Sequence, residues 1–410
     1  MNSKIRGFLR HFYSVPWCVP AWGWAEFAST VRALTTGRLT EGPAPDHFAS
    51  AVRDYLGTKF VLPVNRGRTG IEIGLRAIGI GKGDDVVLPS FLCRSVLDSV
   101  LRTGARAIFA DIGEDLNVTP ASVEASLTPQ TKCVIVAHLF GTPAAIDEIE
   151  VLLASKGIAL MDDAAQALGA LRGDRLVGSF GTCGIVSCGP GKPLAGAAGG
   201  LLVTNDEQLY KRAAAIQLEP EAGSVVGGRV LRFWMWRRLR RYTQPLEVLR
   251  ERLMGAAREA PHLNAPLSNL DGAIALAQFK SLHRHAADRR RNAQVLLGRL
   301  SMLPAKSVTD FSSSAIPVKL VYLLPEVGLS VGEAIEFLSY YGIEAQGGYA
   351  PLHTSYADDT RFPNTTAAWR RVLCVPLETR PARSIPIPFH QPKQTPAAVP
   401  APAGSLTASV

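Results

Sequence analysis

Ile158-Ala159-Leu160-Met161-Asp162-Asp163-Ala164-Ala165-Gln166 is an apolar run that ends in two carboxylates and an amide. Its apolar part predicts a short buried β-strand. A helical pattern over 146–156 precedes it, and helices and short strands alternate in the same way from residue 70 onward. This alternation predicts parallel βαβ units, in which ligand-binding groups gather at the carboxyl ends of the strands. The expected fold class is therefore α/β, with a mainly parallel sheet flanked by helices.

The same pattern predicts the individual elements and their division into domains. Helices are expected over residues 70–80, 95–102, 120–126 and 146–156, and strands over 85–88, 107–111, 133–137 and 158–161. One long helix is expected over 270–300. The expected division is an N-terminal arm with helices (1–55), a large domain (56–265, with an insertion near 225–256), the long helix with a smaller α+β domain (266–380), and a flexible Pro- and Ala-rich tail (381–410).

The composition is that of a compact globular protein. The chain has 410 residues, of which 47% are hydrophobic and 19% charged, so it is too long for one simple core. The net charge of +9 comes without a recognisable nucleic-acid-binding module. The six cysteines are scattered without a CxxC pair, which predicts reduced thiols and no metal site. No apolar run of about 18 residues occurs, and we expect a cytoplasmic protein.

Asp163 is the first candidate site residue, because it stands at the end of the apolar strand. A carboxylate in such a place is unfavourable unless a cation meets it. The protonated nitrogen of a pyridine ring would be such a cation, and the pairing would keep the ring an electron acceptor. The aspartate could instead cap the following helix, which is a common arrangement.

Lys192 is the second candidate, in the stretch Ser187-Cys188-Gly189-Pro190-Gly191-Lys192. This lysine stands beside glycines in an otherwise apolar part of the chain, unlike a lysine on a solvated surface. Burial favours the neutral form of an amine, which can attack an aldehyde. Ser187 would be within reach of a phosphate. A glycine-rich surface loop with an incidental lysine is the other interpretation.

The third candidate is a turn that opens a helix, Asn65-Arg66-Gly67-Arg68-Thr69-Gly70. Backbone N–H groups at the start of a helix bind phosphate, and Gly67 lets a ligand approach closely. Arg68 could add charge and Thr69 a hydroxyl group. Asp163 follows this turn by about 95 residues and Lys192 follows Asp163 by about 30, an order and spacing typical of one architecture.

In this order, the three motifs resemble the DegT/DnrJ/EryC1/StrS sugar aminotransferase family of fold-type I pyridoxal-phosphate (PLP) enzymes. The resemblance covers roughly residues 36–376. Further segments that resemble the family are Thr36-Gly37-Arg38-Leu39-Thr40-Glu41-Gly42-Pro43, the stretch 79–90, His138-Leu139-Phe140-Gly141, the stretch 163–170, and Gly178-Ser179-Phe180-Gly181.

The resemblance implies pyridoxal 5′-phosphate as the cofactor, held by Lys192 as a Schiff base in the large domain. His138 would lie at a strand end near the pocket, as a substrate contact or as a packed structural residue. The other implied cofactor contacts are Asp163 on the pyridine nitrogen, Gln166 on the ring hydroxyl, Gly67, Arg68, Thr69 and Ser187 on the phosphate, and Asn264 reaching the same phosphate across a dimer interface.

The chain departs from the family pattern at several of these places. Cys93 stands where an aromatic residue usually stacks on the cofactor ring, and Asn264-Ala265-Pro266 lacks the arginine of the family's Asn-x-Arg segment. Arg66 and Arg68 stand where small hydroxyl residues are usual. A degenerate member that has kept the fold for binding or regulation is therefore the alternative interpretation.

The activity that the resemblance implies is amino transfer from an amino acid donor to a keto sugar, nucleotide-linked, or to a similar cyclic ketone. Such reactions belong to polysaccharide or antibiotic biosynthesis, and the family implies a homodimer. The family's related dehydratases lack the lysine, so Lys192 favours the aminotransferase.

A basic and aromatic segment runs from Arg229 to Arg241. Aromatic residues beside arginines suit a helix that lies on anionic lipid. They would equally suit an anionic substrate, or an amphipathic insertion packed on a partner subunit. A contact of 229–241 with a membrane surface is one of these possibilities.

Overall fold

The computed structural model describes residues 17–18, 21–217, 223, 225–235, 264–341, 343–356 and 359–377. The predicted tail at 381–410 lies outside these residues, as do most of the insertion near 225–256 and residues 236–241 of the basic segment.

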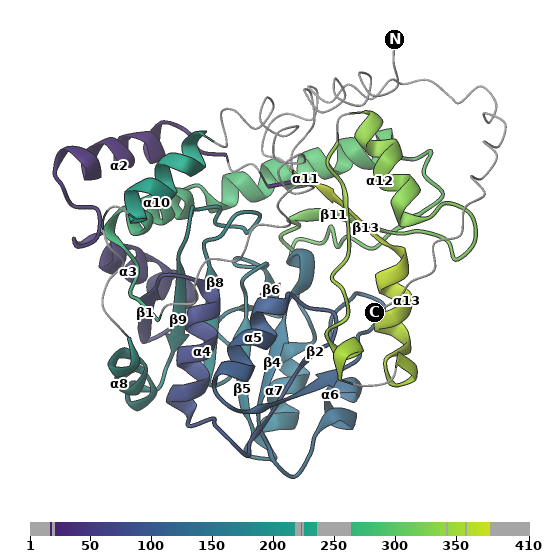
Figure 1. Cartoon of the computed structure of the whole chain (residues 1–410), viewed down its shortest axis with the longest axis horizontal. Helices are drawn as coiled ribbons and strands as arrows, with labels where there is room; N and C mark the ends of the chain where they lie inside the picture. Colours follow the sequence, from purple (N-terminus) through teal and green to yellow (C-terminus); the bar gives the residue numbers. More distant parts are fainter. Residues whose placement is uncertain are drawn as a thin grey trace, which may run out of the picture.

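A seven-stranded sheet forms the centre of the large domain (Figure 1). Strand β2 pairs in parallel with β3 and β4, and the parallel pairing continues through β5 to β8. Only β9 and β1, at one edge, are antiparallel to their neighbours among these strands. The predicted, mainly parallel sheet is confirmed. In spatial order the strands are β1 (Phe60–Val64), β9 (Gly200–Thr204), β8 (Cys183–Ser187), β5 (Ala159–Asp163), β4 (Thr131–Ala137), β2 (Asp85–Pro89) and β3 (Arg106–Ala110).

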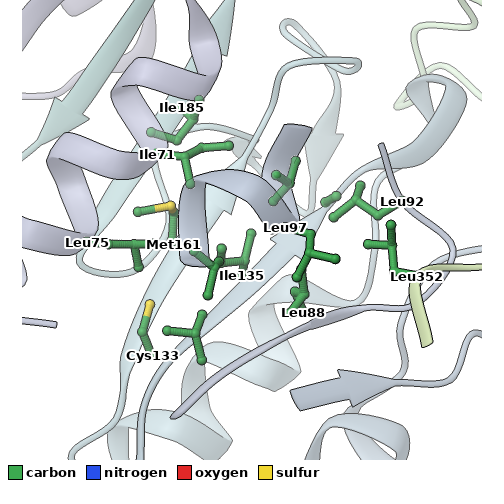
Figure 2. Packing of buried hydrophobic residues seen from close by; sticks show 14 of the residues in the cluster. Ile71, Leu75, Leu88, Leu92, Leu97, Cys133, Ile135, Met161, Ile185 and Leu352 are labelled. Atoms are coloured by element: carbon green, nitrogen blue, oxygen red, sulfur yellow. The ribbon is translucent and has the colours of Figure 1, made fainter. Parts of the chain in front are cut away.

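Helices cover both faces of this sheet, because successive side chains of its buried strands point to opposite sides. Ile135 packs with α4 and α5 on one face, as the close view of this core shows (Figure 2), and α8 belongs to the same core. Val134 and Val136 pack with α6 and α7 on the other face, where α3 and α10 cover the antiparallel edge. The helices are α2 (Trp24–Thr35), α3 (Ala44–Leu56), α4 (Gly67–Ile78), α5 (Arg94–Arg102), α6 (Pro120–Ser126), α7 (Ile146–Ala154), α8 (Glu207–Ile216) and α10 (Asn269–Lys280).

The single helix predicted over 270–300 is wrong, because the structure has two helices there. Helix α10 ends at Lys280, and α11 (Leu282–Arg299) begins after Ser281. The change of direction lets α10 pack against α2 and α3, whereas α11 runs on towards the smaller domain (Figure 1). Helix α4 also begins three residues earlier than predicted, so the glycine turn at Gly67 is its first turn.

The smaller domain is α+β, as predicted, although the boundaries of both domains stay a prediction. A four-stranded antiparallel sheet packs with α11 and α12 around its own core. No helix in the described part of the chain has the length and apolar character needed to cross a membrane. In spatial order, the strands of this sheet are β10 (Lys306–Ser307), β11 (Lys319–Leu323), β13 (Val372–Pro376) and β12 (Gln346–Gly347). The helices after α11 are α12 (Val331–Tyr340) and α13 (Pro363–Arg371). The large domain also contains a hairpin of β6 (Leu171–Arg172) and β7 (Arg175–Leu176).

The two domains meet in a close main-chain contact at Gly141. The N–H of Ile316 donates to the carbonyl of Gly141 at 2.9 Å, and the N–H of Val318 donates to the carbonyl of Phe140 at 3.1 Å. Gly141 has a φ of 94°, and a Cβ atom at this position would overlap with the carbonyl group of Ile316. The contact therefore requires glycine.

Candidate functional site

A cavity of about 120 Å³ lies at the carboxyl ends of β4, β5 and β8, where a parallel sheet binds its ligands. Every cofactor or substrate residue predicted from the sequence lines it, except Thr69 and Asn264. The start of α4, the start of α5 and the segments after three strands contribute its walls. The lining residues are Gly67, Arg68, Ile71, Leu92, Cys93, Ser95, Val96, Ala137, His138, Asp163, Ala165, Gln166, Ile185, Ser187 and Lys192.

The two carboxylates at the end of β5 have different surroundings. Asp163 lines the cavity, and its Oδ1 accepts a hydrogen bond from the N–H of Ala165 at 3.0 Å. Burial raises the pKa of the Asp163 carboxyl group, and the positive charge of Lys192 opposes this shift. Asp162 instead accepts hydrogen bonds from the N–H groups of Gly178 and Phe180, at 2.6 and 3.0 Å. Asp163 is therefore the carboxylate available to a ligand.

Lys192 lies in the loop that follows β8 and reaches the same cavity as Asp163. Its N–H donates to the carbonyl of Gly189 at 3.2 Å, which closes a turn around Gly191. Gly191 has a φ of 76°, a conformation that favours glycine. The loop thus presents one amine opposite one buried carboxylate, within range of electrostatic interaction.

The first turn of α4 and Ser187 form a cradle on another wall of the cavity. The first N–H groups of a helix have no partner within the helix and attract anions. A Cβ atom on Gly67 would lie 2.9 Å from Cβ and 3.0 Å from Oγ of Ser187. The glycine therefore keeps free the space beside the hydroxyl group, and Arg68 adds a cation at the same place. This wall suits a phosphate.

Gln166 is held by neighbours from both domains. Its Nε2 donates to the hydroxyl of Tyr349 at 3.2 Å, and its Oε1 accepts from the N–H of Phe140 at 3.3 Å. Tyr349 stacks on Phe140 with a centroid distance of 6.0 Å, and burial raises the pKa of its hydroxyl group. Tyr349 was not predicted, because it lies in a short irregular segment without a motif.

His138 has a protein partner at each ring nitrogen. Nδ1 accepts from the N–H of Ala144 at 2.9 Å, and Nε2 lies 2.8 Å from Oδ1 of Asp162. Since a main-chain N–H can only donate, Nδ1 carries no proton and Nε2 donates to the carboxylate. Of the two roles predicted for His138, this arrangement favours the packed structural one.

Cys93 lies on the wall where the sequence pattern leads one to expect an aromatic ring. It precedes α5, and its Sγ lies 3.2 Å from Oγ of Ser95. Leu92 and Ile185 supply apolar surface to the same cavity.

Thr69 and Asn264 lie outside the lining of the cavity. The hydroxyl of Thr69 donates to Oδ1 of Asn65 at 2.7 Å and is fully buried. Asn264 donates from Nδ2 to Glu72 at 3.4 Å, and its Oδ1 is buried with no hydrogen-bond partner among the described residues. The phosphate roles of both residues stay predictions.

The arrangement suits a ligand with three features. The cradle at Gly67 and Ser187 can take a phosphate, the buried carboxylate of Asp163 can take a protonated ring nitrogen, and the amine of Lys192 can condense with an aldehyde. Pyridoxal phosphate has all three groups, so the residues present fit it.

Comparisons with known proteins match the chain to one family model and to several solved structures. The model of the DegT/DnrJ/EryC1/StrS aminotransferase family matches residues 23–382. The chain is similar to the aminotransferase TlmJ from Streptoalloteichus hindustanus, with 23% identity over 90% of this chain and 96% of that one, at a TM-score of 0.72. It is also similar to S. venezuelae DesV, with 26% identity over 87% and 89% of the two chains, at a TM-score of 0.68.

A third similar structure is the E. coli GDP-4-keto-6-deoxy-D-mannose-3-dehydratase with bound hydrated PLP. The identity is 20% over 91% of this chain and 98% of that one, with a TM-score of 0.72. At this identity, as for TlmJ, the likeness shows only the fold. Because the dehydratase and the aminotransferases have the same fold, the fold alone does not distinguish the two reactions.

Proposed function

The chain belongs to the DegT/DnrJ/EryC1/StrS aminotransferase family, and from this membership we propose that it transfers an amino group from an amino acid to a keto sugar or similar cyclic ketone. It is a PLP-dependent aminotransferase. The keto-sugar substrate is proposed because one of the similar structures is the dehydratase of a nucleotide-linked keto sugar. The observation that carries the proposal is that Lys192 and Asp163 line one cavity.

The cofactor, when bound, supplies an aldehyde for the amine and a ring that accepts electrons from the reacting carbon. In this proposal Asp163 keeps a proton on the ring nitrogen, and Ser187 and the first turn of α4 hold the phosphate. Nζ of Lys192 anchors the cofactor, and once released it takes the proton from the α-carbon of the amino donor. The apolar walls at Leu92 and Ile185 exclude water from these groups.

Absorbance spectroscopy with purified protein tests this proposal. PLP added to the apoprotein should give a visible band that borohydride abolishes, with the reduced cofactor on the peptide that contains Lys192. Lys192→Ala should lack the band. Lys82→Ala is the matched control, because Lys82 also follows a glycine but is exposed. A band that persists in Lys192→Ala would refute the proposal.

The alternative, a degenerate member without catalysis, rests on Cys93 in place of an aromatic residue. This alternative and the catalytic proposal make different predictions for the protein with bound PLP. A catalyst should lose the visible band when glutamate or glutamine is added, because the donor leaves its amino group on the cofactor. A band that is unchanged by these donors, and by a panel of other amino acids, would favour the alternative.

We also propose that the enzyme works as a homodimer in which Asn264 completes the partner's site. The buried Oδ1 of Asn264, without a hydrogen-bond partner among the described residues, supports this proposal. Mixing Lys192→Ala with Asn264→Ala subunits tests it, because a mixed dimer then has one site with Lys192 from one chain and Asn264 from the other. Wild-type PLP affinity at that site supports a contribution across the interface. Affinity no better than that of Asn264→Ala alone contradicts it.

A second proposal concerns a strip of exposed apolar side chains on α2 and on the helix over 225–235. Phe233 and Trp234, two aromatic residues of the basic segment, pack inward on Trp22 at centroid distances of 4.7 and 5.1 Å. The outward apolar residues are others: Trp24 (78% exposed), Phe27, Val31 and Leu34 on α2, and Val225, Leu231 and Met235 on the second helix.

We propose that this strip lies on an anionic membrane surface. Arg32 and Arg232 are exposed beside it, the acidic residue of α2, Glu26, is buried, and no acid occurs over 225–241. Two copies of the strip would place like charges opposite each other, whereas anionic lipid complements these charges.

Vesicle sedimentation tests this proposal. The protein should sediment with phosphatidylglycerol vesicles but not with phosphatidylcholine vesicles. The double variant Trp24→Ser, Leu231→Ser should no longer sediment with the vesicles, whereas the control Val151→Ser should. If the double variant instead dissociated an oligomer and still bound lipid, the proposal would be contradicted.

A further inference from the structure

The main chain just after Lys192 is held by a side chain from a distant helix. Nη2 of Arg289, on α11, donates to the carbonyl of Lys192 at 3.4 Å and to the carbonyl of Pro193 at 3.3 Å. A little further along the loop, Nε1 of Trp22 donates to the carbonyl of Ala195 at 2.6 Å. The segment between β8 and β9 is otherwise rich in glycine, and so has a flexible main chain of its own.

Arg289 is unusual in its surroundings. The residue is only 6% exposed, and burial lowers the pKa of its guanidinium group to about 10. No carboxylate of the described residues forms an ion pair with it; the neighbouring Asp288 pairs with Arg291 and acts on Arg289 only through its charge. Its Nη1 is buried without a hydrogen-bond partner among the described residues. A buried cation whose lost hydration is only partly replaced by hydrogen bonds lowers the stability of the fold.

We propose that Arg289 is a positioning residue for Lys192, kept although it lowers the stability of the fold. By binding two successive carbonyl groups, the guanidinium fixes the main chain at Lys192 and Pro193. The direction from which Nζ enters the cavity follows from that main-chain conformation. This inference rests on the proposed role of Lys192 as the amine that binds the cofactor.

The position of Arg289 on α11 supports this interpretation. Leu282, Ala286, Ala293 and Leu296 are buried on the same face of the helix, with the polar His285 and Asn292 beside them, so the arginine occupies a place where an apolar residue could pack. The following residue, Arg290, also binds main-chain carbonyls, those of Ser312, Ser313 and Ala315. Arg290 is therefore a matched arginine that holds another loop, away from Lys192.

The experiment compares Arg289→Met with Arg290→Met in the full-length apoprotein. Two quantities are measured: the Tm without cofactor, and the rate constant for capture of added PLP as the borohydride-sensitive band. For Arg289→Met we expect an unchanged or higher Tm, because an apolar side chain replaces a buried charge. The capture rate should fall about tenfold or more, since small displacements of a reacting group reduce rates strongly. Arg290→Met should capture PLP at the wild-type rate.

A second variant protects the test against a folding defect. Arg289→Lys keeps the charge but cannot bridge two carbonyls with a planar group, so its capture rate should also fall. Wild-type capture rates in both Arg289 variants would overturn the inference, as would a lower Tm with an unchanged rate. Absence of the band in the wild-type protein would instead count against the proposed function.

Discussion

Nε2 of His138 donates a hydrogen bond to Oδ1 of Asp162 at 2.8 Å, and both side chains are completely buried. The same carboxylate binds the main chain at Gly178 and Phe180 through its other oxygen. The pair thus connects the ends of β4 and β5 to the loop before β8. Since His138 also lines the cavity, the pair fixes this part of the cavity wall.

His138→Ala should therefore reduce stability more than substrate binding. Loss of the histidine leaves the Asp162 carboxylate with one buried partner fewer, and we expect the free energy of unfolding to fall by about 2–3 kcal/mol. Urea denaturation of the apoprotein measures this change. His47→Ala, at an exposed position, should stay within about 0.5 kcal/mol of the wild type. Unchanged stability together with a raised KM for the keto substrate would instead assign His138 to substrate binding.

Asp163→Asn should stabilise the apoprotein at neutral pH. Burial raises the pKa of Asp163 in the folded state above its unfolded value of about 3.9, so ionisation favours unfolding as the pH rises through these values. The variant should be more stable than the wild type at pH 7, and the difference should disappear below about pH 4. Thermal unfolding across this pH range tests the prediction.

The same variant should lose activity, since an amide cannot pair with a protonated ring nitrogen as a carboxylate does. We expect amino transfer to fall by a factor of about 100 or more. Asp46→Asn, on the exposed part of α3, is the control for both measurements. A pH-independent stability difference would show that the charge of Asp163 is not the cause.

Gly67→Ala should weaken PLP binding by about tenfold or more, because the added methyl group fills the phosphate cradle beside Ser187. Gly70→Ala provides the comparison on the same helix. Its Cβ would meet Ile185 at 3.4 Å, an ordinary contact, so its affinity should stay close to the wild-type value. Both variants gain helix propensity, which removes this effect from the comparison. Equal dissociation constants for the two variants would contradict the cradle.

Cys93→Phe should strengthen cofactor binding by returning an aromatic ring to the cavity wall. Stacked rings contribute about 0.5–1.5 kcal/mol, which corresponds to a roughly two- to tenfold lower dissociation constant for PLP. Cys93→Ala should leave the affinity nearly unchanged. Weaker binding by Cys93→Phe would mean that the wall has no room for a ring.

Much of the large domain could be predicted from the sequence, because its helices and strands follow regular apolar patterns. The predicted helix over 120–126 has the same bounds as α6, and the strand before Asp163 is β5. The break at Ser281 was missed, since the apolar pattern continues across it and only packing on α2 and α3 turns the chain. The period of apolar residues and the helix propensity describe one segment of the chain, and they contain no information on which other segments pack against it.

The candidate site was predictable where a motif combined glycines with a reactive group, as at Gly67 and Lys192. Arg289 was missed, although a signal was present. It stands at an apolar-face position between Ala286 and Ala293 on α11, and a charge there indicates a specific buried role. The sequence had already indicated Asp163 and not Asp162, and the structure adds the physical reason, because the two carboxylates have different hydrogen-bond partners.

The contact between Gly141 and Ile316 has a consequence for how the two domains can move relative to each other. With only a hydrogen atom between the two main chains, and a hydrogen bond on each side of it, neither chain can slide past the other. We therefore expect this contact, together with the hydrogen bonds from Thr365 to Asp111, to oppose any shear of the smaller domain along the end of β4.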